Sequence, residues 1–125
     1  MDTLDLVRDW HEHFDVPVQK KPTLPNERVA MRLAILEEEV RELREAVEAN
    51  DMTEVLDALS DIQFVLDGTY LEFGLHDVKS DAFKEVYRSN MSKLGENGQP
   101  VLREDGKVLK GPNFTPPDLA QFVED

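Results

Sequence analysis

The sequence contains no cysteine among its 125 residues. Disulfide bonds, thiolate zinc sites and cysteine nucleophiles are therefore excluded, and the lack of cysteine fits a reducing compartment. Basic residues are also scarce, because 14 Lys and Arg stand against 27 Asp and Glu, which gives a net charge of −13. This imbalance argues against binding a nucleic acid polymer through its phosphates and against docking on an anionic membrane.

Long apolar runs are missing as well. No stretch approaches the ~20 apolar residues that a transmembrane helix requires. The first residues, MDTLDLVRDWHEHF, lack the basic and apolar regions of a signal peptide. We therefore expect a soluble, cytoplasmic protein. Hydrophobic residues make up 40% of the chain and charged residues 33%, as in a helix-rich globular domain of this length.

The spacing of apolar residues predicts an all-α fold with four helices. We expect these helices over about residues 2–14, 26–50, 53–73 and 77–95. Asn26 is a suitable N-cap for the second helix, and Asp51 or Thr53 for the third. Asp105-Gly106 marks the turn of a small C-terminal β-hairpin, and a proline-rich tail follows it. We predict a single domain over 1–125, with an N-terminal helix and connector in 1–21 and the hairpin and tail in 96–125.

Acidic residues gather in the middle of the chain. The stretch LEEEVRELREAV, residues 36–47, contains five glutamates, and between residues 37 and 61 ten acidic residues face only two arginines. On a helical wheel, Glu39 borders the apolar stripe of the second helix, and Glu42 lies one turn further along. Such an acidic face is often only solvated, and that interpretation stays open.

The third helix is apolar around most of its circumference, so we expect it to be buried. It nevertheless carries Asp57 and Asp61 one turn apart. Buried carboxylates must be protonated, paired or bound to metal, and the conceivable cationic partners are Arg28, Arg32 and Arg41.

Antiparallel pairing of the second and third helices across the short ANDMT link would bring four carboxylates together. These are Glu39, Glu42, Asp57 and Asp61. Like charges at that density require a counter-ion, and Mg²⁺ is the commonest hard divalent cation in cells. The pattern therefore predicts a site for one to three divalent cations.

The same residues carry a resemblance. LEEEVRELREAV followed by EVLDALSDIQFVLDGT resembles the all-α nucleoside triphosphate pyrophosphohydrolases, which include the MazG proteins, the dimeric dUTPases and the phosphoribosyl-ATP pyrophosphohydrolases. Their motifs are EExxE on one helix and ExxD on the next. Glu38, Glu39 and Glu42 match the first motif and Asp61 the end of the second, but Ala58 stands where the second motif has glutamate. The blocks DALSD, SNMSK and DGKVLKGPNF make the phosphoribosyl-ATP branch the most similar.

The resemblance implies a MazG-like four-helix fold that works as a homodimer or homotetramer. It also implies hydrolysis of a nucleoside triphosphate between the α and β phosphates, which releases the monophosphate and pyrophosphate. We interpret Glu39, Glu42, Asp57 and Asp61 as ligands of Mg²⁺, with Mn²⁺ able to substitute. Glu38 would orient or deprotonate the attacking water.

Cations and amides that could bind the substrate lie later in the chain. The candidate substrate-binding residues are Arg88, Asn90, Lys93, Lys107 and Lys110. Asn90 and Lys93 share a helix face and suit a sugar or base edge and a phosphate, respectively, or they only end the helix. Lys107 and Lys110 could close over the nucleotide as a lid.

An alternative of a different class remains open. The chain could be a non-catalytic helical dimerisation module or a nucleotide sensor, whose acidic residues only confer solubility. Ala58, in the place of a family glutamate, is the feature that supports this alternative.

Overall fold

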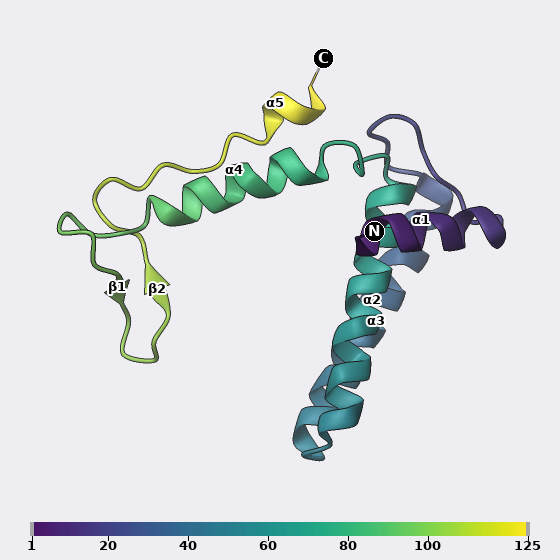
Figure 1. Cartoon of the computed structure of the whole chain (residues 1–125), viewed down its shortest axis with the longest axis horizontal. Coiled ribbons are helices and arrows are strands. Elements are labelled where there is room, and N and C mark those ends of the chain that lie inside the picture. The colour runs from purple at the N-terminus through teal and green to yellow at the C-terminus, as the bar shows by residue number, and fades with distance from the viewer. Residues whose placement is uncertain (1, 125) are drawn as a thin grey trace. The chain divides into compact units, whose positions relative to one another are not determined.

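The computed structural model describes residues 2–124 and divides into two compact units, the first extending through Asp77 and the second beginning at Val78 (Figure 1). Within these residues, four main helices and a two-stranded hairpin confirm the predicted all-α fold class. The single domain over 1–125, whose end residues lie outside the described range, stays a prediction. Among residues 2–124, none of the helices has the length and apolar character needed to cross a lipid bilayer.

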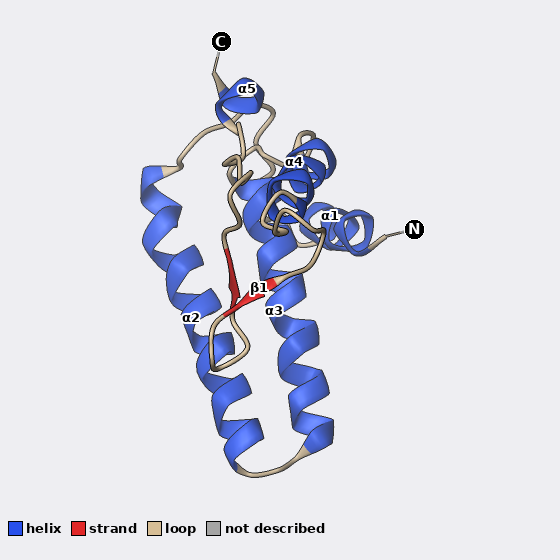
Figure 2. Ribbon diagram, turned by 90° about the vertical axis from the view of Figure 1, so that its left-hand side faces the viewer, coloured by secondary structure: helices blue, strands red, loops and turns tan. Residues whose placement is uncertain are grey.

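The first unit consists of three helices. They are α1 (Thr3–His13), α2 (Asn26–Glu48) and α3 (Met52–Glu72). Figure 2 shows α2 and α3 as an antiparallel pair joined by a short turn, and α1 packs against α3. This pair holds all the acidic residues proposed above as metal ligands.

Local signals explain where these helices begin. Asp51 caps α3, because its carboxylate accepts a hydrogen bond of 3.1 Å from the backbone N–H of Glu54. Asn50 just before it has φ of 53°, a left-handed conformation that asparagine tolerates and that ends α2 sharply. The N-cap predicted for α2 is wrong, since Pro25 occupies that position and no side chain caps the helix.

The interior of the first unit is small. Its buried apolar residues are Val7, Ala46, Ala58 and Leu71. Ala46 and Ala58 lie near the α2–α3 turn, where small side chains let two helices approach closely. The prediction that α3 is buried all round is wrong for a single chain, because Leu56 and Leu59 are exposed.

The second unit begins with α4 (Lys79–Met91), which ends four residues earlier than the predicted Gly95. The hairpin pairs β1 (Val101–Leu102) with β2 (Val108–Leu109) in antiparallel register. Gly106 in its turn has φ of 89°, as a tight turn requires. A short helix, α5 (Ala120–Val123), lies in the tail and was not predicted.

Candidate metal centre

Two turns of α2 supply the first part of the candidate site. Glu39 and Glu42 are three residues apart, so both side chains project from the same side of the helix. Glu39 is partly buried at the border of the apolar stripe, whereas Glu42 is exposed. The position of Glu39 beside apolar residues removes part of the water that would otherwise stabilise its charge.

Asp61 on α3 completes the group. The short turn places this part of α3 opposite the second half of α2 (Figure 2). Each of Glu39, Glu42 and Asp61 offers one carboxylate oxygen such that the three atoms lie within 4.8 Å of one another. We call these three residues the carboxylate cluster.

Two members of the carboxylate cluster, Glu39 and Asp61, have raised pKa values. Burial raises the pKa of Glu39 to about 7, helped by a hydrogen bond that its protonated form donates to Glu42 and by the nearby negative charges. The pKa of Asp61 is also raised, first by burial and then by the charges of Asp57 and Glu42. Oxygen Oε2 of Glu39 is buried and has no hydrogen-bond partner. A cation at this point would supply both the missing charge and the missing partner.

The donor set fits a hard divalent ion. Carboxylate oxygens are the ligands of Mg²⁺, Ca²⁺ and Mn²⁺, and Mg²⁺ binds them at about 2.0–2.1 Å. Three oxygens within 4.8 Å of one another can converge on one such ion through small side-chain rotations. The residues present are therefore suited to hold a divalent metal.

Glu38 and Asp57 lie next to the carboxylate cluster, not within it. Glu38 is exposed, and its charge contributes to the raised pKa of Glu39. Asp57 is exposed too, and together with Glu42 it lines a hollow of about 260 Å³ near the α2–α3 turn. This hollow, also lined by Glu45, Asp51 and Glu54, continues the acidic surface away from the cluster.

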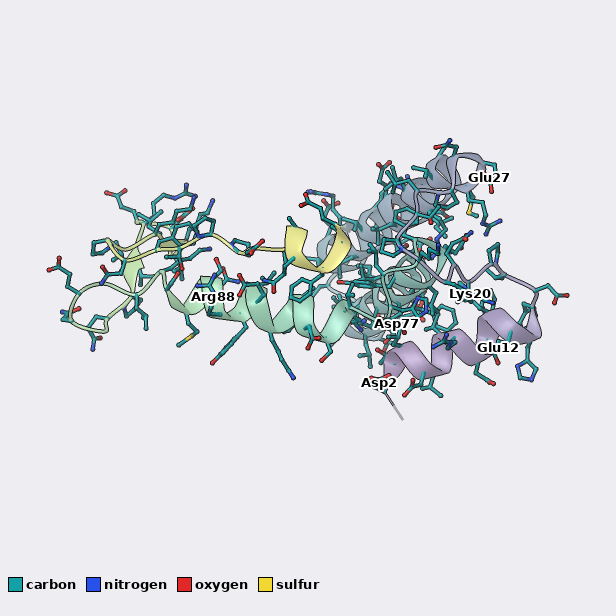
Figure 3. The ribbon with its side chains drawn as sticks, turned by 90° about the horizontal axis from the view of Figure 1, so that it is seen from above. Asp2, Glu12, Lys20, Glu27, Asp77 and Arg88 are labelled. Carbon is teal, nitrogen blue, oxygen red and sulfur yellow. The ribbon has the colours of Figure 1, made fainter. Side chains whose placement is uncertain are left out.

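The predicted substrate-binding residues all belong to the second unit. The guanidinium of Arg88, labelled on α4 in Figure 3, donates hydrogen bonds to Glu85 at 2.8 and 2.9 Å and to Oγ1 of Thr115 at 2.6 Å. It thereby holds the pKa of Glu85 down at about 2, together with a hydrogen bond from the backbone of Asp118. Arg88 thus ties α4 to the segment that leads to α5.

The other four predicted residues have weaker ties. Asn90 is exposed and Lys93 half-buried, and the backbone N–H of Lys93 donates to the carbonyl of Asn90 at the end of α4. In and after the hairpin, Lys107 is exposed, and Nζ of Lys110 lies 4.8 Å from the centre of the Phe114 ring. Their ammonium and amide groups are thus on the surface of the second unit.

A second charged group lies between α2 and α3. Arg28 and Arg32 on α2 both contact the carboxylate of Glu72 on α3, with Nη1 of Arg32 at 2.8 Å from Oε2. These arginines were considered as partners of Asp57 and Asp61, and that alternative is wrong. A signal for the true pairing exists, because Glu72 is an acidic residue on the mostly apolar third helix, eleven positions and hence about three turns after Asp61.

A known protein family matches most of the chain. The model of the family described as phosphoribosyl-ATP pyrophosphohydrolase matches residues 7–90, a range that includes the carboxylate cluster and nearly all of α4. A search among curated proteins finds no match.

Proposed function

Because the chain belongs to the phosphoribosyl-ATP pyrophosphohydrolase family, we propose that it hydrolyses a nucleoside triphosphate to the monophosphate and pyrophosphate with Mg²⁺ bound at Glu39, Glu42 and Asp61. Membership of this family, part of the MazG-like all-α superfamily, indicates a pyrophosphohydrolase that acts on a nucleotide triphosphate, and such enzymes generally depend on a divalent metal. The identity of the metal and the roles of individual residues are our proposal.

One observation carries this proposal: three carboxylates converge and form no ion pair with a cation of the described residues, and burial together with the neighbouring acidic groups raises the pKa of Glu39 to about 7. An acidic surface alone would repel a triphosphate. Bound divalent cations would reverse the local charge, polarise the phosphoryl oxygens and lower the pKa of bound water.

The chain's own residues then have distinct tasks. Glu39, Glu42 and Asp61 hold the metal, and Asp57 offers a further oxygen on the open side of the cluster. Glu38 accepts a proton from the water whose oxygen attacks the α-phosphorus. The bond from the α-phosphorus to the oxygen that bridges it to the β-phosphate breaks, and pyrophosphate leaves with that oxygen.

In this proposal, residues of the second unit bind the substrate. Lys93, Lys107 and Lys110 would neutralise phosphate charge, and the amide of Asn90 would meet the sugar or the base. Arg88 is the least suited of the predicted five, because Glu85 and Thr115 already occupy its guanidinium. We further propose a homodimer or homotetramer in the cytoplasm, in which a second copy covers exposed apolar residues of α2 and α3.

Ala58 favours a second candidate function. It is buried, and it lies three residues before Asp61, where the family motif has glutamate. If Asp57 does not replace that ligand, the carboxylate cluster holds metal too weakly for catalysis. The chain would then be a dimerisation or nucleotide-sensing module.

An activity panel separates the two functions. Phosphoribosyl-ATP and all common NTPs and dNTPs are incubated with Mg²⁺, Mn²⁺ or EDTA, and the products are identified by chromatography. We expect monophosphate and pyrophosphate from at least one substrate, only with metal. Glu39→Gln and Asp61→Asn should lower the rate by a factor on the order of 100 or more, since each removes a ligand.

Glu37→Gln is the matched control, because Glu37 is an exposed glutamate on the same helix and outside the cluster. It should leave the rate unchanged, and circular dichroism should show the same helicity in all variants. Pyrophosphate release in EDTA would contradict the proposal. Failure to hydrolyse any triphosphate would favour the non-catalytic module.

A further inference from the structure

Arg32 crosses from α2 to α3 and contacts α3 at three successive turns. Its Nη2 donates to the backbone carbonyl of Val65 at 2.7 Å and to Oγ1 of Thr69 at 3.2 Å. Its Nη1 lies 2.8 Å from the carboxylate of Glu72. The planar guanidinium fixes all these partners in one geometry, which a flexible ammonium could not do.

The surroundings of Arg32 shield its charge from water and leave space for its side chain. Arg32 is 6% exposed and Glu72 is 0% exposed, so neither charge has water as an alternative partner. Gly68 lies on α3, four residues before its end, where a Cβ would come within 2.5 Å of Nη2 of Arg32 and 3.0 Å of Nε2 of His11. Glycine in a helix interior costs about 1 kcal/mol relative to alanine. Here it provides the space through which the guanidinium reaches the α3 backbone.

The contact lies at a defined distance from the carboxylate cluster. Arg32 precedes Glu39 by seven residues, or two turns, and is thus on the same face of α2 about 10 Å away. On α3, Val65 follows Asp61 by one turn. The carboxylate cluster therefore lies between two fixed points, the contacts of Arg32 on one side and the α2–α3 turn on the other.

The carboxylate cluster needs such support. Its three acidic groups repel one another, and before a cation binds, this repulsion favours separation or sliding of α2 and α3 at that level. The small residues near the turn hold one side of the cluster. On the other side, Arg32 joins the two helices by hydrogen bonds to a backbone carbonyl, which resists sliding along the helix axis.

We propose that Arg32 is a positioning residue that sets the register of α2 against α3, so that Glu39 and Glu42 oppose Asp61 closely enough to share a divalent cation. This inference rests on the proposed function, in that it assigns a metal to the cluster. It attributes to Arg32 an effect on metal affinity that acts entirely through the positions of other residues.

The sign of the effect distinguishes positioning from charge. Arg32 is positive, so its removal reduces the electrostatic repulsion of an incoming cation and by itself strengthens metal binding. If Arg32 sets the helix register, its removal weakens metal binding instead. A weaker affinity in a variant without this charge therefore cannot be an electrostatic effect.

The test is an electron paramagnetic resonance titration of Mn²⁺ against the full chain. Arg32→Met should weaken Mn²⁺ binding roughly 10- to 100-fold, the range typical for residues that orient metal ligands. Arg32→Lys keeps the charge but loses the planar fork, and it should recover only part of the affinity. Val7→Ala is the control, because it removes buried volume from α1 and leaves the contacts between α2 and α3 intact.

A second measurement uses the metal-free protein. Amide hydrogen exchange in EDTA should become faster around residues 39–42 and 58–61 in Arg32→Met than in Val7→Ala, even where the two unfold at the same temperature. If Arg32→Met does not fold, Thr69→Val removes one contact of the guanidinium and should give the same changes on a smaller scale. Mn²⁺ affinity and exchange equal to those of Val7→Ala would overturn the inference.

The two proposals fail in different ways. Absence of Mn²⁺ binding in the wild-type chain would contradict the metal site, and hydrogen exchange in the metal-free variants would still decide whether Arg32 sets the register. Normal Mn²⁺ binding in both wild type and Arg32→Met would leave the metal site in place and remove the role of Arg32.

Discussion

Two groups of charged side chains lie between α2 and α3, and their charges are balanced in different ways. In one, Arg28 and Arg32 surround the buried carboxylate of Glu72, and opposite charges meet at hydrogen-bond distance. In the other, Glu39, Glu42 and Asp61 bring three acidic groups together. The first group is neutralised within the chain, whereas in our proposal the second is neutralised by a bound cation. The difference separates a structural ion pair from the site at which we propose that a cation binds, although both occupy the same helix pair.

The largest effect on stability is expected from breaking the ion pairs of Glu72 with Arg28 and Arg32. Glu72→Gln removes the carboxylate that forms ion pairs with Arg28 and Arg32, which leaves the buried guanidinium of Arg32 without its ion-pair partner. The free energy of unfolding should fall by about 3–5 kcal/mol, as for other buried pairs that lose one partner. Urea denaturation followed by circular dichroism measures this change.

Glu45→Gln is the control for this substitution, because the ion pair of Glu45 is exposed and long, with its Oε1 at 4.0 Å from Nε of Arg41. It should change the free energy of unfolding by less than about 0.5 kcal/mol. Equal effects of the two substitutions would mean that Arg28 and Arg32 find other partners.

A smaller effect on stability is expected from adding Mg²⁺, which we propose binds at the carboxylate cluster. In our proposal Mg²⁺ binds only the folded chain, so at a concentration 100 times its dissociation constant it should stabilise the protein by about 2.7 kcal/mol. Asp61→Asn should raise the unfolding temperature in EDTA, since it removes one of the repelling charges, and should lose most of the gain with Mg²⁺. Thermal denaturation with and without Mg²⁺ checks both statements, and an unchanged gain in Asp61→Asn would contradict the ligand assignment.

The smallest effect is a pH dependence of stability that has opposite signs for Glu39 in the carboxylate cluster and for His11 beside Arg32. The pKa of Glu39 in the folded chain is about 7, above its ordinary value of 4.5. Between these values the folded state holds a proton that the unfolded state has lost, so this residue lowers the stability of the metal-free protein as pH rises from 4.5 to 7. Glu39 is partly exposed, and solvent screening keeps the contribution small.

His11, beside Arg32, acts in the other direction. Burial lowers the pKa of His11 from its ordinary 6.5, and its Nδ1 donates to the carbonyl of Pro17 at 3.1 Å. Below pH 6.5 the unfolded state takes up a proton that the folded state does not, so stability falls as pH decreases. In EDTA between pH 5 and 7, His11→Gln should therefore become more stable on acidification and Glu39→Gln less stable. Parallel pH profiles of these two variants would contradict both assignments.

The carboxylate cluster was largely predictable from sequence, because it depends on local periodicity. Glu39 and Glu42 are one turn apart beside an apolar stripe, and the short link at Asn50 requires antiparallel helices, which brings Asp61 opposite them. Asp57 was predicted in the same group and lies beside it, since it is one turn nearer to the α2–α3 turn than Asp61 on the same side of α3. Which of the two acids lies level with Glu39 and Glu42 depends on how the helices are aligned along their axes, for which a sequence contains no local signal.

The ion pairs of Glu72 with Arg28 and Arg32 were not predicted, because they depend on how α2 and α3 are aligned along their axes. Arg28 and Arg32 could have reached any acid on α3, and only the observed register places them at Glu72. Gly68 was a usable signal, because a glycine in the interior of a long helix often marks a close approach by another group. The exposure of Leu56 and Leu59 was missed for a different reason, since an apolar helix surface indicates burial without indicating which chain covers it.

The turn at residues 49–51 has a consequence for the order in which the first unit folds. It joins α2 directly to α3, so the oxygens of Glu42 and Asp61 are only 19 positions apart along the chain. Contacts over such short loops close quickly and at low entropic cost. We therefore expect α2 and α3, with the carboxylate cluster between them, to pair early during folding. If a cation binds the cluster as we propose, it would favour this helix pair before α1 has docked.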